Sequence, residues 1–407
     1  MKFLFIHQNF PSQFKFLAPE LAKLGHEVCA FTLQEVGGKE WNGVRLFKYG
    51  LSRTNAKDAH PWIVDFESKI VRGEACMRAS MELKKQGYYP DIIIAHPGWG
   101  ESLFLKQVWP EASLKLYCEF FYAPSGQDVG FDPEFLNKDE ADRGRVLLKN
   151  ANILLHFQQA DSGISPTHWQ AKTFPESIRN RISVIHDGID TSRVKPNQTA
   201  TITINDELII SKNDEIITFV ARSLEPYRGF HTFVRSLPSV LSERPNSRVL
   251  IVGNEGYSYG GAPPRGTTWK STFLSEISSQ LDDQQKNRIH FLGRVSYDKF
   301  VSLLQVSSVH VYLTYPFVLS WSLLEAMSAG CSIIASDTQP LHEVIIGDQT
   351  GILTDFFDHI ELANKICDLL GDPNKKESLG RAAREFAVKN YDLKTICLPR
   401  QLKWAQN

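Results

Sequence analysis

The chain has 407 residues, of which 42% are hydrophobic and 22% are charged, and its formal net charge is -1. A chain of this length exceeds what one hydrophobic core usually organises, so we expect two domains of roughly 150 to 200 residues each. The balanced charge argues against a nucleic-acid-binding protein, because such proteins normally carry an excess of Lys and Arg.

Short apolar runs alternate with amphipathic stretches in the first half, a pattern typical of βα units around a parallel sheet. Strands are predicted at residues 3–6, 28–32, 91–95, 115–121 and 183–185, with helices between them that include 14–24 and 67–86. Residues 92–94 are all isoleucine, which predicts a strand buried on both faces. We therefore expect an open, doubly wound α/β domain.

A polar segment at 194–213, rich in Asn and Thr, is predicted to be the linker between the two halves. Strands are predicted after it at 216–221, 248–252, 289–292, 309–313 and 332–336. The expected domains are therefore 1–193 and 194–385, and 386–407 is expected to form a C-terminal helix that packs back on the first domain. Two α/β halves in tandem place a ligand at the carboxyl ends of their strands.

Two arginines follow the first strand of the second half. Arg222 and Arg228 bracket a proline turn, and because Arg presents a rigid fork of donors, the pair could converge on a diphosphate. The alternative is a solvated loop whose arginines face water.

A helix is predicted to begin near Ser320 or Ser322 and to end at Gly330. The backbone N–H groups of its first turn, from Ser320 through Trp321 to Ser322, could hold a phosphate. Glu325 lies one turn further on, where its carboxylate could accept two hydrogen bonds from a ribose diol. The alternative is a capping box, in which Glu325 satisfies only the backbone at Ser322.

Four motifs together resemble family 4 of the GT-B glycosyltransferases. They are the arginine loop, the Val-Gly turn at 252–253, Leu-Gly-Arg-Val at 292–295 and Leu-Leu-Glu-Ala-Met-Ser-Ala-Gly at 323–330. The resemblance implies the GT-B fold, an α/β architecture with two Rossmann-like domains facing across a cleft. It also implies retaining, metal-independent transfer of a sugar from a nucleotide donor, with Arg222 and Arg228 on the diphosphate and Glu325 on the ribose.

The resemblance is incomplete at the sugar-binding position. Relatives usually carry a second glutamate eight residues before Glu325, where this chain has Phe317, and Ser320 stands where a glycine is usual. The sugar itself is therefore left open. The residues expected to bind the nucleotide sugar are Asn254, Tyr259, Arg294, Val295, Leu319, Ser320, Trp321, Ser322 and Glu325. For the loops at 253–261 and 292–297, ordinary βα turns are the alternative.

The first half is expected to bind the acceptor. The resemblance implies that His96, at the end of a buried strand, lies beside the donor sugar, although a lone histidine is often structural. A charge at the end of an apolar strand is costly unless paired, so Glu119 is favoured over Asp128 as the group that binds or deprotonates the acceptor hydroxyl. A structural hydrogen bond is the alternative for Glu119. Gln8 and Asn9, which follow the first strand, and Asp128 are expected to contact the acceptor.

Cysteine use and apolar run lengths indicate the compartment. Six scattered cysteines without a C-x-x-C motif favour reduced thiols in the cytoplasm. The apolar run at 1–6 is too short for a signal-peptide core, and no run reaches the ~20 residues that span a bilayer. We expect a cytoplasmic protein, with peripheral contact with the inner face of the plasma membrane left open.

The sequence thus predicts a retaining hexosyltransferase of polysaccharide biosynthesis. Its donor is expected to be a nucleotide sugar, with UDP preferred on frequency alone, and its acceptor a glycan or lipid-linked saccharide. The expected catalytic residues are His96, Glu119, Arg222 and Arg228, with no metal and no further cofactor. Two alternatives are an inactive sugar-nucleotide or glycan-binding protein of the same fold and a sugar-nucleotide epimerase.

Overall fold

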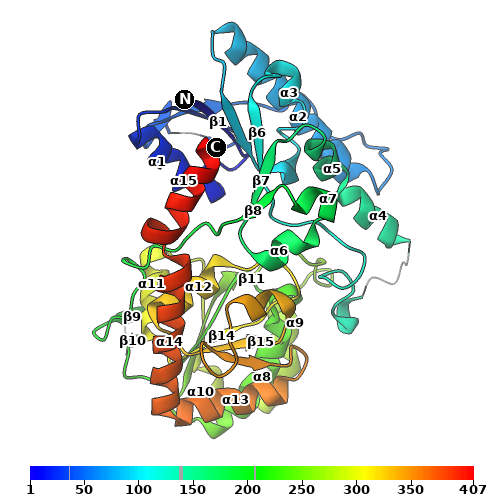
Figure 1. Ribbon diagram of the computed structural model, residues 1–407. Helices are drawn as coiled ribbons and strands as arrows, with labels where there is room; N and C mark the ends of the chain where they lie inside the picture. The colour runs from blue at the N-terminus through cyan, green and yellow to red at the C-terminus, as the bar shows by residue number, and fades with distance from the viewer. Residues whose placement is uncertain (36, 137–140, 206–207) are drawn as a thin grey trace. The chain divides into compact units, whose positions relative to one another are not determined.

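The computed structural model describes residues 1–35, 37–136, 141–205 and 208–407, and it divides into two compact units (Figure 1). The first unit comprises Met1–Val129, Asn137–Asp187 and Lys394–Asn407, and the second comprises Gly130–Leu136 and Gly188–Leu393. Apart from Gly130–Leu136, the chain therefore enters the second unit after Asp187, where the sequence placed the boundary after 193. It leaves that unit after Leu393, where the sequence placed the second boundary after 385.

The first unit is built on an eight-stranded sheet of order β3-β4-β2-β1-β5-β6-β7-β8, parallel except between β3 and β4. Its strands are β1 (Lys2–Ile6), β2 (Glu27–Thr32), β3 (Glu40–Trp41), β4 (Val44–Lys48), β5 (Ile92–Ala95), β6 (Ser113–Tyr117), β7 (Ser162–Ser165) and β8 (Ile182–Val184). Its helices are α1 (Leu17–Lys23), α2 (Val64–Lys85), α3 (Leu105–Val108), α4 (Asp142–Lys149), α5 (Ala151–Phe157), α6 (His168–Thr173), α7 (Glu176–Arg179) and α15 (Leu398–Gln406).

Strand β5 is buried on both faces, as its continuous hydrophobicity predicted. Ile93 packs in one core cluster, whereas Ile92 and Ile94 pack in the cluster on the opposite face of the sheet. The predicted strand 115–121 is wrong at its end, because β6 stops at Tyr117. Beyond it, side chains of α6 replace the sheet partners: the Gln170 amide donates to the Glu119 carbonyl at 2.8 Å, and Thr173 accepts from the Phe121 amide.

The second unit contains a six-stranded parallel sheet of order β13-β12-β11-β14-β15-β16 and a separate antiparallel pair, β9 and β10. Its strands are β9 (Thr201–Asn205), β10 (Leu208–Ser211), β11 (Ile216–Ser223), β12 (Arg248–Asn254), β13 (Ile289–Gly293), β14 (Val309–Tyr312), β15 (Ile333–Ser336) and β16 (Ile352–Thr354). Its helices are α8 (Phe230–Glu243), α9 (Trp269–Ile277), α10 (Asp283–Lys286), α11 (Tyr297–Val306), α12 (Trp321–Ala329), α13 (His359–Gly371) and α14 (Pro373–Tyr391).

The predicted linker at 194–213 is wrong. This segment contains β9 and β10, and Ile202 and Ile210 are buried in the core of the second unit. Hydrophobic residues alternate with polar ones in these strands, and the hydrophobic face packs in the core, with β9 against α11. The prediction failed because abundant Asn and Thr indicate only a solvent-exposed face, whereas alternate residues of the same strands form the buried face.

Both large sheets have a point at which the strand order reverses. In the first unit it lies between β1 and β5, and in the second between β11 and β14. In open α/β sheets, ligands bind outside the carboxyl ends of the strands at this point. The loops that follow these four strands are therefore where each unit is built to hold a ligand.

Candidate functional site

Arg222 and Arg228 lie in the loop after β11 but differ in burial. Arg222 is exposed and makes no hydrogen bond or ion pair with the residues that the structure describes, whereas Arg228 is 8% exposed. Gly229 follows with φ +66°, and a Cβ there would lie 2.3 Å from the Cβ of Leu313. Only glycine lets this loop pack directly on the end of β14, so the close packing that buries Arg228 depends on Gly229.

Arg228 contacts the segment that leads into α12. Its Nη1 donates to Thr314 Oγ1 at 2.7 Å, to the Val318 carbonyl at 3.3 Å and to the Tyr312 hydroxyl at 3.4 Å. The same hydroxyl accepts the backbone N–H of Ser320 at 3.0 Å. The loops after β11 and β14 thus bring a guanidinium to the beginning of a helix.

Arg228 forms no close ion pair, although the carboxylate of Glu225 lies near it. Burial lowers its pKa, and the neighbouring tyrosines and Glu225 outweigh this effect, so the net pKa lies above the ordinary value and the group is a permanent cation. Within the described part of the chain it forms no ion pair, and its hydrogen-bond partners are neutral oxygens. A buried cation that makes no ion pair favours an anionic ligand at this point.

Helix α12 begins and ends as the sequence predicted. Ser320 is the N-cap and its Oγ accepts the Ser322 amide at 3.3 Å, while Gly330 ends the helix with φ +78°. The capping-box alternative for Glu325 is wrong, because with Ser320 as N-cap the third helical residue is Leu323 and Glu325 lies one position beyond the first turn.

Glu325 is held by a tyrosine that the sequence reasoning did not select. The Tyr297 hydroxyl donates to Glu325 Oε1 at 2.8 Å, and Glu325 is 8% exposed. Burial, followed by the charge of Glu325, raises the pKa of Tyr297. Tyr297 begins α11 directly after the turn that contains Arg294 and Val295. Its position next to that motif was the sequence feature that could have identified it as a site residue.

The loop after β12 is anchored by Glu225, which sequence reasoning also missed. This carboxylate is fully buried and accepts the backbone N–H groups of Ser258 and Gly260 at 3.1 Å and of Tyr259 at 3.3 Å. Such charge-assisted bonds to successive amides fix a loop in place. They hold the Tyr259 ring 5.4 Å from the guanidinium of Arg228.

The remaining residues that were predicted to bind the nucleotide sugar differ in burial and in contacts. Tyr259 also lies 5.1 Å from the ring of Phe317, so two aromatic rings flank Arg228. Leu319 is buried in the core of the unit, which leaves its backbone as the part that can meet a ligand. Other placements are as follows: Trp321 and Val295 are half-buried against the same core, Arg294 is exposed, and the Asn254 carbonyl accepts the Leu224 amide.

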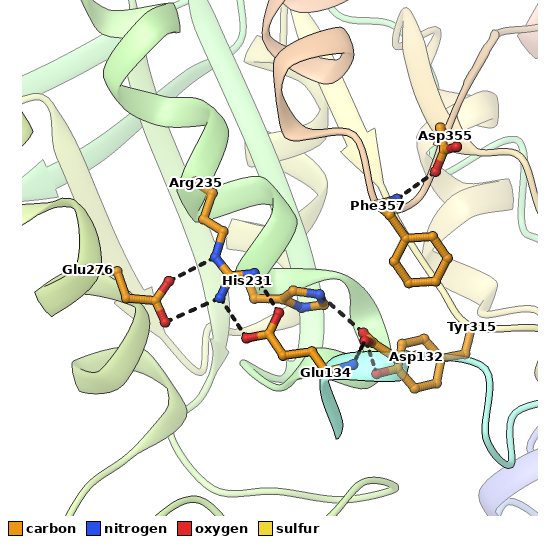
Figure 2. A network of polar contacts seen from close by, with 8 residues as sticks. All are labelled: Asp132, Glu134, His231, Arg235, Glu276, Tyr315, Asp355 and Phe357. Atoms are coloured by element: carbon orange, nitrogen blue, oxygen red, sulfur yellow. Dashed lines mark hydrogen bonds and ion pairs between the residues drawn. The ribbon is translucent and has the colours of Figure 1, made fainter. Parts of the chain in front are cut away.

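The segment Gly130–Leu136 belongs to the second unit, although most of its neighbours in sequence belong to the first. Figure 2 shows its two acidic side chains in a polar network. Asp132 accepts the Tyr315 hydroxyl at 2.8 Å and lies 3.2 Å from His231 Nε2. Glu134 forms an ion pair with Arg235 at 2.7 Å, and Arg235 also forms an ion pair with Glu276. Because the Tyr315 ring packs 4.7 Å from that of Tyr227, this network supports the loop that carries Arg228.

Two histidines meet at the switch point of the first unit. His7 follows β1 and His96 follows β5, with ring centroids 5.5 Å apart. His96 Nδ1 accepts the Gly98 amide at 3.1 Å, which places the ring proton on Nε2, 3.4 Å from Glu119 Oε2. Burial and then the neighbouring His96 lower the pKa of His7 to about 3. Because Nδ1 of His96 accepts a hydrogen bond, Nε2 of the same ring is arranged as a hydrogen-bond donor.

The predicted acceptor residues do not gather at one place. His96 and Glu119 line the same cavity, whereas Gln8, Asn9 and Asp128 do not line it. Asn9 is exposed and accepts from the Gln34 amide at 2.7 Å, while the Gln8 backbone N–H donates to Glu101 Oε2. The cavity is completed by side chains of α2 and α4, which sequence reasoning missed because they lie far from any strand end.

Glu101 predicts a pH dependence of stability. Burial raises its pKa from 4.5 to about 7 against the hydrogen bonds from Tyr49 and Gln8. A carboxyl with a raised folded-state pKa stabilises the fold below its unfolded pKa, and this contribution is lost as pH rises through about 7.

Compared with Glu101→Gln, we expect the wild type to lose up to about 3 kcal/mol of unfolding free energy between about pH 5 and pH 8. Glutamine can keep both hydrogen bonds, with its oxygen accepting from Gln8 and its NH₂ donating to Tyr49. Urea denaturation of both proteins at both pH values measures the difference. Parallel pH dependence of the two proteins would contradict the assignment.

Within the described ranges, no group of three or more His, Cys, Asp or Glu residues could hold a metal ion. No helix in these ranges is at once long and apolar enough to cross a membrane.

Comparison with protein families matches both units. Residues 24–194 match the glycosyl transferase family 4 group, and residues 201–386 match the glycosyl transferases group 1. Spore coat protein SA of Bacillus subtilis is 27% identical over 225 residues, which are 54% of this chain and 56% of that protein. The chain thus spans about half the length of this curated relative.

Solved structures share the fold over the full length. Sucrose-phosphate synthase from Thermosynechococcus elongatus matches with a TM-score of 0.73 and 18% identity, covering 100% of this chain and 98% of that one. Anabaena HepE in complex with UDP and glucose matches with a TM-score of 0.68 and 15% identity, covering 100% of both chains. At this identity the likeness concerns the fold.

Proposed function

Because the chain belongs to the group 1 glycosyl transferases and has their GT-B fold, we propose that it transfers a hexose from a UDP-sugar to a glycan or lipid-linked acceptor. The observation that carries the proposal is the buried Arg228, which forms no ion pair with a described residue, at the beginning of α12 and at the switch point of the second sheet. UDP is preferred because HepE, which shares the fold, binds it. Retention of configuration, a role in polysaccharide synthesis and a cytoplasmic location belong to the same proposal.

The proposed chemistry follows from where charge develops. When the bond between the sugar and the diphosphate breaks, negative charge grows on the leaving phosphate, and preorganised donors there lower the barrier. Arg228 and the α12 N-terminus supply them, with exposed Arg222 as a second cation. Glu325 is proposed to accept the ribose hydroxyls, and the loop with Arg294 and Val295 to contact the base.

The first unit is proposed to hold the acceptor. His96 donates from Nε2, and Glu119 at 3.4 Å from that nitrogen can accept the proton of an acceptor hydroxyl. Gln8, Asn9 and Asp128 lie outside the cavity that contains these two residues, so any role for them requires acceptor groups beyond it.

A thermal-shift panel of UDP-, GDP- and ADP-sugars tests the donor. A ligand at a hundred times its Kd stabilises by about 2.7 kcal/mol, so the matching nucleotide should raise the melting temperature by several degrees. Slow donor hydrolysis without acceptor would separate a transferase from an inactive binding protein. Recovery of an epimerised donor would favour the epimerase alternative, and no response to any nucleotide sugar would contradict the proposal.

We expect donor hydrolysis or transfer to continue in excess EDTA. Cationic side chains and helix amides stabilise the leaving diphosphate in place of a metal ion under the proposed mechanism. The rate is measured after dialysis against EDTA and again after addition of Mg²⁺ or Mn²⁺. Activity that disappears with EDTA and returns only with metal would contradict the mechanism.

A further inference from the structure

A cavity of about 240 Å³ in the first unit contains more positive charge than the proposed reaction explains. Its charged lining consists of three cations, Lys69 and Arg72 of α2 and Lys149 at the end of α4, and two carboxylates, Asp65 and Glu119, with His96 beside them. The proposed transfer reaction assigns no role to these three cations. Their presence therefore calls for a separate explanation.

Two of the three cations form no ion pair with a described residue, although carboxylates lie near both: Glu101 near Arg72, and Asp128 and Asp65 near Lys149. Lys69 pairs with Asp65 at 2.8 Å, but Arg72 forms no ion pair or hydrogen bond with the residues that the structure describes, and its Nε is buried. Lys149 lies 4.4 Å over the ring of Tyr122 and forms no ion pair with a described residue.

Burial disfavours the charged form of Lys149, and the nearby carboxylates offset this cost only in part. Burial, as the largest cause, lowers the pKa of Lys149; Arg145 and Lys69 lower it further, and Asp128 and Asp65 oppose them. A bound anion would relieve this cost. Glu119, the other carboxylate of the cavity, lies beside His96.

The cavity also presents buried polar atoms that lack hydrogen bonds. His96 is 5% exposed and Asn152 is fully buried. His96 Nε2 lies 3.4 Å from Glu119 Oε2 without forming a hydrogen bond, and Asn152 Oδ1 likewise has no hydrogen-bond partner among the described residues. The Asn152 amide nitrogen donates to the Pro97 carbonyl at 2.6 Å, which leaves its oxygen as an acceptor. One donor and one acceptor without partners match the hydroxyl groups of a sugar, because buried polar groups are normally satisfied.

We propose that this cavity binds an acceptor sugar that carries an anionic group, a phosphate or a carboxylate. Arg72 and Lys149 contact the anion, for which the planar guanidinium offers paired donors, while His96 and Asn152 contact hydroxyls. The volume is below the ~300 to 1,000 Å³ of sites for larger ligands, so it takes a single sugar unit. That the sugar is the acceptor rests on the proposed function, whereas its binding does not.

Calorimetric titration of the full chain without donor tests the cavity. The three probes are glucose 6-phosphate, glucuronate and glucose, which separate a phosphate from a carboxylate and both from a neutral sugar. At least one anionic probe should bind ten times more tightly than glucose. Arg72→Gln should remove about tenfold or more of that affinity, because it removes charge-assisted hydrogen bonds.

The matched control is Arg78→Gln, which changes an exposed arginine of the same helix that pairs with Glu74. It should leave the affinity for every probe unchanged. Lys149→Gln gives an independent second variant in case Arg72→Gln does not fold, as judged by its melting temperature. UDP affinity should be the same in all three variants.

Anionic probes that bind no tighter than glucose, no measurable binding of any probe, or equal losses in Arg72→Gln and Arg78→Gln would each overturn the proposal. Selective binding of an anionic probe without any sugar transfer would leave the cavity assignment intact and remove the proposed function. The two proposals can therefore fail separately.

Discussion

Arg228→Ala is expected to weaken UDP binding by about a hundredfold or more. The substitution removes the buried guanidinium beside the α12 N-terminus, and each charge-assisted hydrogen bond contributes roughly 1.5 to 3 kcal/mol. Since 1.4 kcal/mol is a factor of ten, the loss of two such bonds to the diphosphate gives this magnitude. Calorimetric titration with UDP measures it.

Two variants separate charge from geometry. Arg228→Lys keeps the charge but loses the planar set of paired donors that a guanidinium offers to a diphosphate, so its affinity should lie between those of the wild type and Arg228→Ala. Arg222→Ala should have a smaller effect, because water screens an exposed charge. Unchanged UDP affinity in a folded Arg228→Ala protein would place the diphosphate elsewhere.

Glu325→Gln is expected to weaken UDP binding by on the order of 1 to 3 kcal/mol, because two charge-assisted bonds to the ribose become weaker neutral ones. Glutamine can still accept the hydrogen bond from Tyr297, so the melting temperature should change little. Titration with UDP and with its 2′-deoxyribose analogue measures the effect. The wild type should prefer the ribose form, and the variant should lose most of this preference.

Tyr297→Phe is the matched control for Glu325. It removes the hydroxyl that orients the carboxylate but keeps the charge, so we expect a smaller loss of ribose preference than in Glu325→Gln. Full preference for ribose in Glu325→Gln would remove Glu325 from the nucleotide site. Arg228 and the helix amides would then be the remaining donor contacts.

Local patterns predicted the elements that repeat along the chain. Three neighbouring isoleucines indicated β5 and its burial on both faces. Ser320 or Ser322 and then Gly330 were predicted as the ends of α12, and the helix begins at the first of the two serines. These signals depend on residues a few positions apart, which share one element whatever the remainder of the fold does. The family also followed from short motifs, because each lies within one loop or one helix turn.

Contacts between distant segments were beyond the same reasoning. In sequence, Glu225 is a single acidic residue in a loop, and only the fold shows that it accepts the amides of Ser258 and Gly260. Likewise, no local pattern around Asp132 predicts its contacts with Tyr315 and His231. Arg72 and Lys149 belong to separate helices that only the packed unit brings to one cavity. Periodicity reports which face of an element is buried, whereas the partner of a buried charge is set by strand order and helix packing, and these join residues that no local spacing relates.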